Sequence, residues 1–132
     1  MLQYMLDTDT ASYIISNRYP NATAKFAKYL DAVCICCPTE AELRYGALRR
    51  KNQRLIEKVD EFCRAMPCLA WNSNAVQEYA ELRTYLEEQG KLIGAMDMLI
   101  AAAALAEHLT LVTNNIAHFS RVPKLKLENW LE

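Results

Sequence analysis

The stretch MLQYMLDTDTAS, residues 1–12, is a short apolar run followed by polar residues at the start of a helical pattern. Residues 2–6 form a short apolar run of the kind that fits a buried strand. The run ends at DTDT, residues 7–10, whose residue types favour helix caps and turns over strand interiors. Asp7 therefore either caps a following helix or supplies a carboxylate to a site at the end of the strand.

Short apolar runs alternate with longer helical patterns over the whole chain. Strands are expected at residues 2–6, 32–37, 68–71 and 109–113, with a weaker candidate at 125–128. Helices are expected at residues 8–17, 22–31, 39–51, 53–65, 73–89 and 94–108. Strands separated by helices predict crossover connections and a mostly parallel sheet. The sequence thus predicts one α/β domain over residues 1–132.

The composition is that of a folded globular chain, with 52% hydrophobic and 23% charged residues. The formal net charge of −1 gives no overall attraction to nucleic acid or anionic lipid, so any such affinity needs a local patch. The N-terminal residues lack the pattern of a signal peptide, and the longest apolar run, residues 98–106, is too short to span a bilayer. A cytoplasmic protein without membrane association is expected.

The chain has five cysteines, an odd number without a secretion pattern, which predicts reduced thiols. Cys34 and Cys37 form a C-x-x-C spacing, but it lies in an apolar strand pattern. No second pair follows at a spacing typical of zinc sites. The cysteines are therefore expected to be small core residues rather than metal ligands or a redox pair.

Polar residues follow several predicted strands at positions where the fold would gather them. In parallel α/β sheets, ligands bind at the carboxyl ends of the strands, where crossover helices also begin. Asp7 follows the first strand, Glu42 falls in the first turn of the helix after the second, and Asp97 falls in the first turn of a later helix. Asn115 follows the fourth strand. These side chains are expected to converge on one edge of the sheet.

Each carboxylate also has a structural explanation. Asp7 could act as a helix N-cap, and Thr39 and Glu42 match a T-x-x-E capping box, in which Glu42 would reach back to the Thr39 amide. Asp97 precedes nine apolar residues, so strong burial is expected, which is costly for an unpaired carboxylate. Its alternative role is to complement the helix dipole. Glu40 is expected to be solvated.

Three carboxylates at one sheet edge, without a nucleophilic Ser or Cys context, favour a hard divalent cation such as Mg²⁺ or Mn²⁺. Such a cation can activate a water and neutralise charge on a scissile phosphate. A basic segment after Glu42 fits a phosphate substrate, although a solvated helix face is the alternative. Its cations are Arg44, Arg49, Arg50, Lys51 and Arg54. The histidines, His108 and His118, are isolated in sequence and receive no role.

Four segments, in order, resemble those of PIN domains, and specifically of the VapC-type ribonuclease toxins of bacterial toxin–antitoxin pairs. MLDTDT resembles the opening strand, with the first aspartate at Asp7. TEAELRYG resembles the helix that carries the family's glutamate, at Glu42, and GKLIGAMDMLIAAAA puts the third acid at Asp97. LVTNNIAHF resembles the segment after the fourth strand, and LENWL fits the C-terminal tail. The resemblance covers essentially the whole chain.

This resemblance implies a PIN-like three-layer α/β/α sandwich with a mostly parallel sheet of four to five strands. It implies Mg²⁺- or Mn²⁺-dependent cleavage of structured RNA, commonly tRNA or ribosomal RNA loops, with initiator tRNA favoured. Asp7, Glu42 and Asp97 would hold the metal, and Asn115 stands where many members carry an aspartate, which favours one cation over two. A homodimer and a VapB-type antitoxin are also implied, with promoter DNA contacted through the antitoxin.

Two other functions fit parts of the sequence. Haloacid-dehalogenase-type phosphatases begin with D-x-D-x-T, whereas here Thr10 falls one place early and Asp97 has no nearby acidic partner. A non-catalytic RNA- or partner-binding module would use the basic segment and leave the acids as helix caps. Glu42→Gln and Asp7→Asn distinguish the nuclease from the binding module, because both keep a capping function while removing affinity for a cation.

Overall fold

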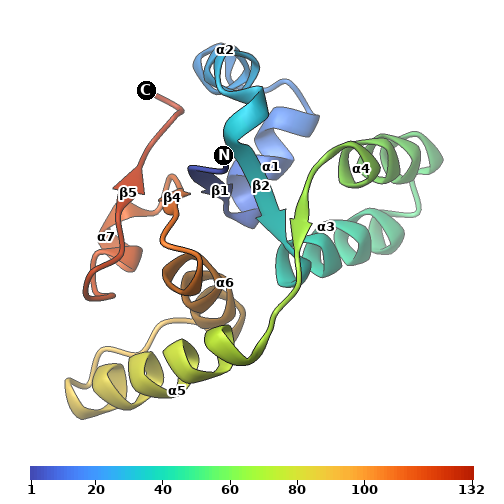
Figure 1. The fold of residues 1–132 in the computed structure, drawn as a ribbon. Coiled ribbons are helices and arrows are strands. Elements are labelled where there is room, and N and C mark those ends of the chain that lie inside the picture. The colour runs from blue at the N-terminus through green and yellow to red at the C-terminus, as the bar shows by residue number, and fades with distance from the viewer.

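The computed structural model describes residues 1–132, with five strands in one parallel sheet (Figure 1). The strand order is β3-β2-β1-β4-β5, and every neighbouring pair is parallel. The strands are β1 (Tyr4–Leu6), β2 (Val33–Cys36), β3 (Cys68–Leu69), β4 (Thr110–Val112) and β5 (Leu127–Glu128). The helices are α1 (Thr8–Ile15), α2 (Pro20–Lys28), α3 (Cys37–Arg50), α4 (Gln53–Ala65), α5 (Ser73–Glu88), α6 (Ala95–Ala106) and α7 (Ile116–Phe119). A short 3₁₀ turn spans Leu30–Ala32.

The sheet is covered on both faces, because neighbouring residues of its central strands point to opposite sides. Met5 of β1 and Leu111 of β4 pack into a cluster with α5 and α6. Leu6 and Val112, the next residues along, pack into a second cluster with α1, α3 and α4. The chain therefore forms an α/β/α sandwich whose two apolar cores are separated by the sheet, which confirms the fold class expected from the sequence.

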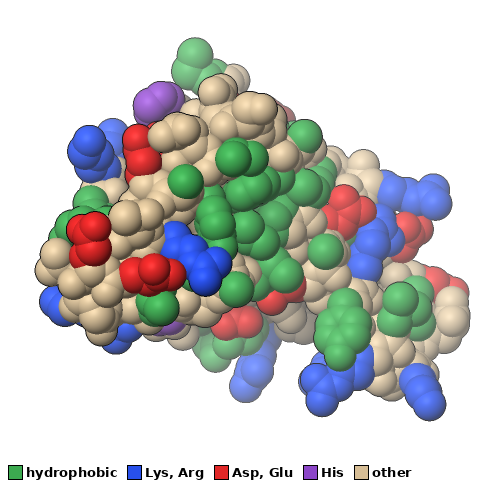
Figure 2. All heavy atoms as spheres, turned by 90° about the horizontal axis from the view of Figure 1, so that it is seen from below, with side chains coloured by type: hydrophobic (Ala, Val, Ile, Leu, Met, Phe, Trp, Pro, Cys, Tyr) green, Lys and Arg blue, Asp and Glu red, His purple; other side chains and the backbone are tan.

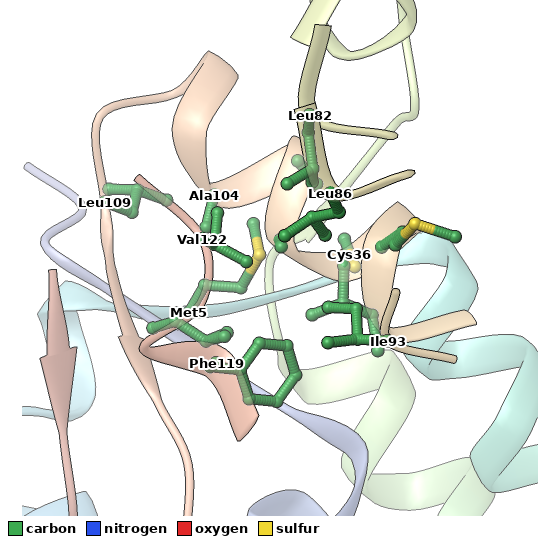
Figure 3. Packing of buried hydrophobic residues seen from close by; sticks show 14 of the residues in the cluster. Met5, Cys36, Leu82, Leu86, Ile93, Ala104, Leu109, Phe119 and Val122 are labelled. Carbon is green, nitrogen blue, oxygen red and sulfur yellow. The ribbon is translucent and has the colours of Figure 1, made fainter. Parts of the chain in front are cut away.

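The α5–α6 face is packed closely because α6 presents small side chains to its neighbours (Figure 3). Ala101, Ala103 and Ala104 are almost fully buried, and Leu82 and Leu86 of α5 belong to the same cluster. Phe119 of α7 closes this core from the side of β4. The apolar run expected at 98–106 is thus a buried helix, and no helix is long and apolar enough to cross a membrane.

The element boundaries differ from the sequence predictions at a few places. The second helix begins earlier than expected, at Pro20, because proline is well tolerated at the first helical position. It ends at Lys28 rather than at residue 31, and the 3₁₀ turn Leu30–Ala32 follows. The short helix α7 was not predicted, since four residues are too few for a periodic pattern. Cys34, Cys36 and Cys63 are core residues as expected, whereas Cys37 and Cys68 are exposed.

Candidate active site

Asp7 lies where β1 ends and α1 begins, at the centre of the sheet's carboxyl edge. Its Oδ1 accepts a hydrogen bond from the Thr10 amide at 2.8 Å, so it is the N-cap of α1. The Asp7 amide donates to the Val112 carbonyl of β4 at 3.0 Å. The side chain is 5% exposed. Asp7 is therefore both a helix cap and a buried carboxylate held between the two central strands.

Burial raises the pKa of Asp7 above its ordinary value. Hydrogen bonding from the Thr113 hydroxyl and the Thr10 amide lowers this pKa in turn, and the nearby charge of Asp9 raises it. No lysine or arginine is among the groups that act on Asp7. A carboxylate buried without a protein cation is a group whose ionised form would be stabilised by a bound cation.

Glu42 reaches the same region from α3 through a hydrogen bond that joins two helices. The Thr8 hydroxyl donates to Glu42 Oε1 at 2.5 Å. The capping box expected between Thr39 and Glu42 is wrong, because α3 begins at Cys37 and Glu42 lies in its second turn. Since Thr8 directly follows Asp7, the bond brings the Glu42 carboxylate to the end of β1.

Asp97 lies in the first turn of α6, as expected, but it is not buried. Its side chain is 38% exposed, because the apolar residues that follow it face the core while the start of the helix faces solvent. Asp97 Oδ2 lies 3.0 Å from His118 Nε2 of α7. The prediction that His118 is isolated is wrong. The sequence position of His118 could have indicated this contact, because His118 follows Asn115 in the segment that leaves the same edge of the sheet.

The segment after β4 links the two parts of the site. The Thr113 hydroxyl hydrogen-bonds to Asp7 and lowers its pKa. It also accepts a hydrogen bond from the Asn115 amide at 3.0 Å. His118, three residues further on, contacts Asp97. Asn115 itself is exposed and is the N-cap residue of α7. One short segment thus contacts both Asp7 and Asp97, the two aspartates of the predicted site.

The donor chemistry of these residues fits a hard divalent cation, but the structure contains no closed metal cage. No group of three or more His, Cys, Asp or Glu side chains is placed to hold a metal ion. Mg²⁺ usually takes one or two carboxylates and completes its shell with water and substrate phosphates. Asp7, Glu42 and Asp97 each use part of their hydrogen-bonding capacity on a neighbour, and a carboxylate has about four acceptor positions.

The basic segment expected from the sequence divides into bound and free cations. Arg44 Nη1 lies 2.9 Å from Asp60 Oδ1, and Arg44 Nε lies 2.7 Å from Glu40 Oε2. Glu40 is therefore paired rather than simply solvated, and Arg44 already contacts two carboxylates. The remaining cations, Arg49, Arg50, Lys51 and Arg54, are exposed where α3 meets α4. Lysine and arginine side chains gather at this end of the molecule (right in Figure 2).

Comparison with known proteins agrees with the fold. Residues 4–125 match the PIN domain. The ribonuclease VapC2 of Rickettsia felis is 40% identical over 131 residues, covering 96% of this chain and 97% of that protein. The tRNA(fMet)-specific endonuclease VapC of Salmonella typhimurium is 31% identical, covering 98% and 99%. The chain therefore belongs to the PIN-domain family, among the VapC ribonucleases.

The similarity extends to three-dimensional structure. The crystal structure of VapBC2 from Rickettsia felis, bound to a DNA fragment from its promoter, contains a chain that superimposes with a TM-score of 0.90. The two chains are 36% identical, and the match covers 98% of this chain and 99% of the other. The likeness is thus to the whole fold rather than to one motif.

Proposed function

We propose that this protein is a divalent-metal-dependent endoribonuclease that acts as the toxin of a type II toxin–antitoxin pair and cuts a structured RNA loop. The observation that carries the proposal is the buried Asp7 at the end of β1, linked to Glu42 through Thr8. Membership among the VapC ribonucleases supports the same activity. Cleavage of RNA needed for translation would arrest growth, and we propose a cytoplasmic location for this activity.

Each proposed site residue has a role that follows from its surroundings. Asp7, Glu42 and Asp97 would hold Mg²⁺ or Mn²⁺, each with its carboxylate oriented by a hydrogen bond from a neighbour. The cation, when bound, would activate a water for attack and neutralise charge on the scissile phosphate. Asn115, exposed beside Thr113, would hydrogen-bond to water or substrate without adding a charge.

We propose tRNA as the substrate, with initiator tRNA favoured. The support is the name of the Salmonella typhimurium relative, a tRNA(fMet)-specific endonuclease at 31% identity. This assignment concerns the identity of the RNA and is separate from the cleavage chemistry. A digest of total tRNA, with the cut positions mapped, tests it directly, and cleavage of ribosomal RNA instead would correct the substrate without removing the nuclease.

We propose a VapB-type antitoxin as the protein partner, with promoter DNA bound through it. The promoter-bound VapBC2 complex supports this by similarity. An apolar groove of about 770 Å³ between α1, α2 and α4, lined by Ile14, Phe26, Phe62 and Met66 among others, supports a protein ligand. We also propose that the protein is a homodimer. Light scattering tests this by measuring whether its mass in solution is twice that of one chain.

The proposed activity is tested by incubating total tRNA with the purified protein and Mg²⁺, with and without EDTA. We expect cleavage at one loop that EDTA abolishes. Glu42→Gln and Asp97→Asn should fold normally, as judged by circular dichroism, and lose this cleavage. Unchanged cleavage in either variant would remove that residue from the site.

The alternatives leave different signatures in the same experiment. RNA that binds but stays intact under Mg²⁺ and Mn²⁺ would favour the non-catalytic binding module. A phosphate trapped on Asp7 would favour the haloacid-dehalogenase-type phosphatase. We do not expect the phosphatase, because no lysine acts on Asp7. The helix cap that Asp7 forms fits the binding module as well as the nuclease, so the cleavage assay decides between these two.

A further inference from the structure

A charged groove beside the proposed active site is lined by α1, α3 and α4. It has a volume of about 430 Å³. Its charged lining residues are the acids Asp9 and Glu42 and the cations Arg18 and Arg50, and Thr8 lines it beside them. Glu42 and Arg50 belong to the same helix, eight residues apart, so about 12 Å of helix separates them. The groove therefore runs from the carboxylates of the site toward two cations.

Arg18 is held in place at this groove by aromatic rings rather than by an acid. Its guanidinium carbon lies 5.7 Å from the ring centroids of both Tyr13 and Tyr19. The two rings contact each other edge to face, with centroids 4.8 Å apart. Asn17, just before it, adopts a left-handed conformation that turns the chain out of α1, and the Arg18 amide donates to the Tyr13 carbonyl at 3.0 Å. The guanidinium is thus oriented while its N–H groups remain free.

Arg50 lies at the end of α3 and is also without an acidic partner. None of the ion pairs in the structure includes Arg18 or Arg50, whereas Arg44 on the same helix is paired with two carboxylates. A guanidinium without an acidic partner can bind an incoming phosphate without first breaking an ion pair. Arg49, the neighbour of Arg50, is also exposed but does not line the groove.

We propose that this groove binds the backbone of single-stranded RNA beside the cleavage point, with Arg18 and Arg50 contacting its phosphates. The assignment rests on the proposed ribonuclease function and names the part of the substrate that this surface holds. A length of about 12 Å corresponds to roughly two to four nucleotides of one strand. We expect the bound RNA to be an unpaired loop, because a single strand can follow a groove between helices while its bases stack on aromatic rings.

The test measures binding separately from cleavage. Fluorescein-labelled oligouridine is titrated with the full chain in EDTA, so that no cleavage occurs, at several salt concentrations. We expect Arg18→Gln and Arg50→Gln each to weaken binding roughly threefold to tenfold and to reduce the slope of log K against log salt by about 0.7. Arg49→Gln is the matched control and should bind like the unmodified chain. Thermal unfolding of each variant excludes a folding defect.

The outcomes separate this inference from the proposed function. Equal RNA binding by the Arg50→Gln and Arg49→Gln variants would overturn the groove assignment, even if the protein cleaves tRNA. Weakened binding in the groove variants, with no cleavage under any divalent metal, would keep the groove and remove the nuclease. If the groove variants instead lose affinity for an oligoglutamate peptide while RNA binding is unchanged, the groove binds an acidic protein segment and the proposal is wrong.

Discussion

Asp7 combines two demands on one side chain, since it caps α1 and also carries a charge in a buried position. Burial raises its pKa from the ordinary value of 3.8, so the folded protein holds a proton on Asp7 over a pH range in which the unfolded chain has lost it. Stability therefore falls as the pH rises through this range, and the loss is complete above the raised pKa. The site is thus built at a cost in stability.

Asp7→Asn should make the protein more stable at pH 7. Asparagine cannot ionise, and its side-chain oxygen can still accept from the Thr10 amide as an N-cap. We expect the melting temperature at pH 7 to rise by a few degrees and the gain to disappear as the pH falls below about 4. Asp9→Asn, an exposed acid in the same turn, is the control and should change little. A lower melting temperature at pH 7 would mean that the hydrogen bonds of the carboxylate outweigh its burial.

His118 should act by orienting Asp97 rather than by contacting RNA. Removing it in His118→Ala frees the Asp97 carboxylate, and we expect kcat to fall about tenfold or more with KM nearly unchanged. His118→Gln keeps a donor and should recover part of the loss. Titration with Mn²⁺, followed by electron paramagnetic resonance, should show weaker binding in His118→Ala. If both variants cleave RNA normally, the hydrogen bond to Asp97 has no part in the reaction.

The residues of the candidate site were proposed from the sequence, but the side chains that contact them were not. Asp7 and Asp97 were proposed because one follows a strand and the other lies in the first turn of a helix. Glu42 was proposed over Glu40 on the resemblance, and it lies in the second turn of α3 rather than in the first. The Thr8–Glu42 bond joins residues 34 positions apart, and the His118–Asp97 contact joins residues 21 apart. Such pairs leave no periodic signal, so neither was predicted from the sequence.

At the scale of elements, α3 and α4 are joined by a small network of charges. Arg44 of α3 bridges Glu40, on its own helix, and Asp60 of α4, which also lies 3.0 Å from Arg64. Both carboxylates raise the pKa of Arg44, and Arg44 holds their pKa values below the ordinary range. Sequence patterns identified Arg44 as a basic residue but not as a paired one, because its partner Asp60 lies on another helix.

Arg44→Gln should therefore weaken packing between these helices without weakening RNA binding. The pairs are partly exposed, so we expect a small fall in melting temperature, and the difference should shrink in high salt. Oligouridine affinity should remain that of the unmodified chain, in contrast to Arg50→Gln. A loss of RNA affinity in Arg44→Gln that equals the loss in Arg50→Gln would show that the basic segment acts as a whole.

The alternation of strands and helices is what made the element order predictable. The first four strands were predicted near their observed positions, and even the weak candidate at 125–128 contains β5. The order of the strands within the sheet was not predicted, because it depends on which crossovers pack on which face. Side chains of β1 alternate between the two cores, and this alternation is too short in a three-residue strand to be read with certainty from sequence.

At the scale of the whole molecule, the C-terminal tail packs against the first strand through Trp130. Trp130 is fully buried, although it lies two residues from the end of the chain. Its ring packs edge to face on the ring of Tyr4, with centroids 5.2 Å apart, and stacks on the ring of Tyr29, with centroids 5.8 Å apart. Its Nε1 donates a hydrogen bond to Glu128 Oε1 at 3.0 Å. The tail therefore joins β5, β1 and the segment after α2, which are far apart in sequence.

Trp130→Ala should destabilise the whole fold rather than only the tail. Removing a buried tryptophan costs about 3–5 kcal/mol, a large part of the stability of a typical domain. We expect the midpoint of urea unfolding to fall sharply, whereas Trp130→Phe, which keeps an aromatic ring against Tyr4 and Tyr29, should lose much less. Because Trp71 is the one other tryptophan and lies against the opposite core, its fluorescence in both variants reports unfolding far from the tail. An unfolding midpoint for Trp130→Ala equal to that of the unmodified chain would mean that the tail is a local addition and that the sheet is stable without it.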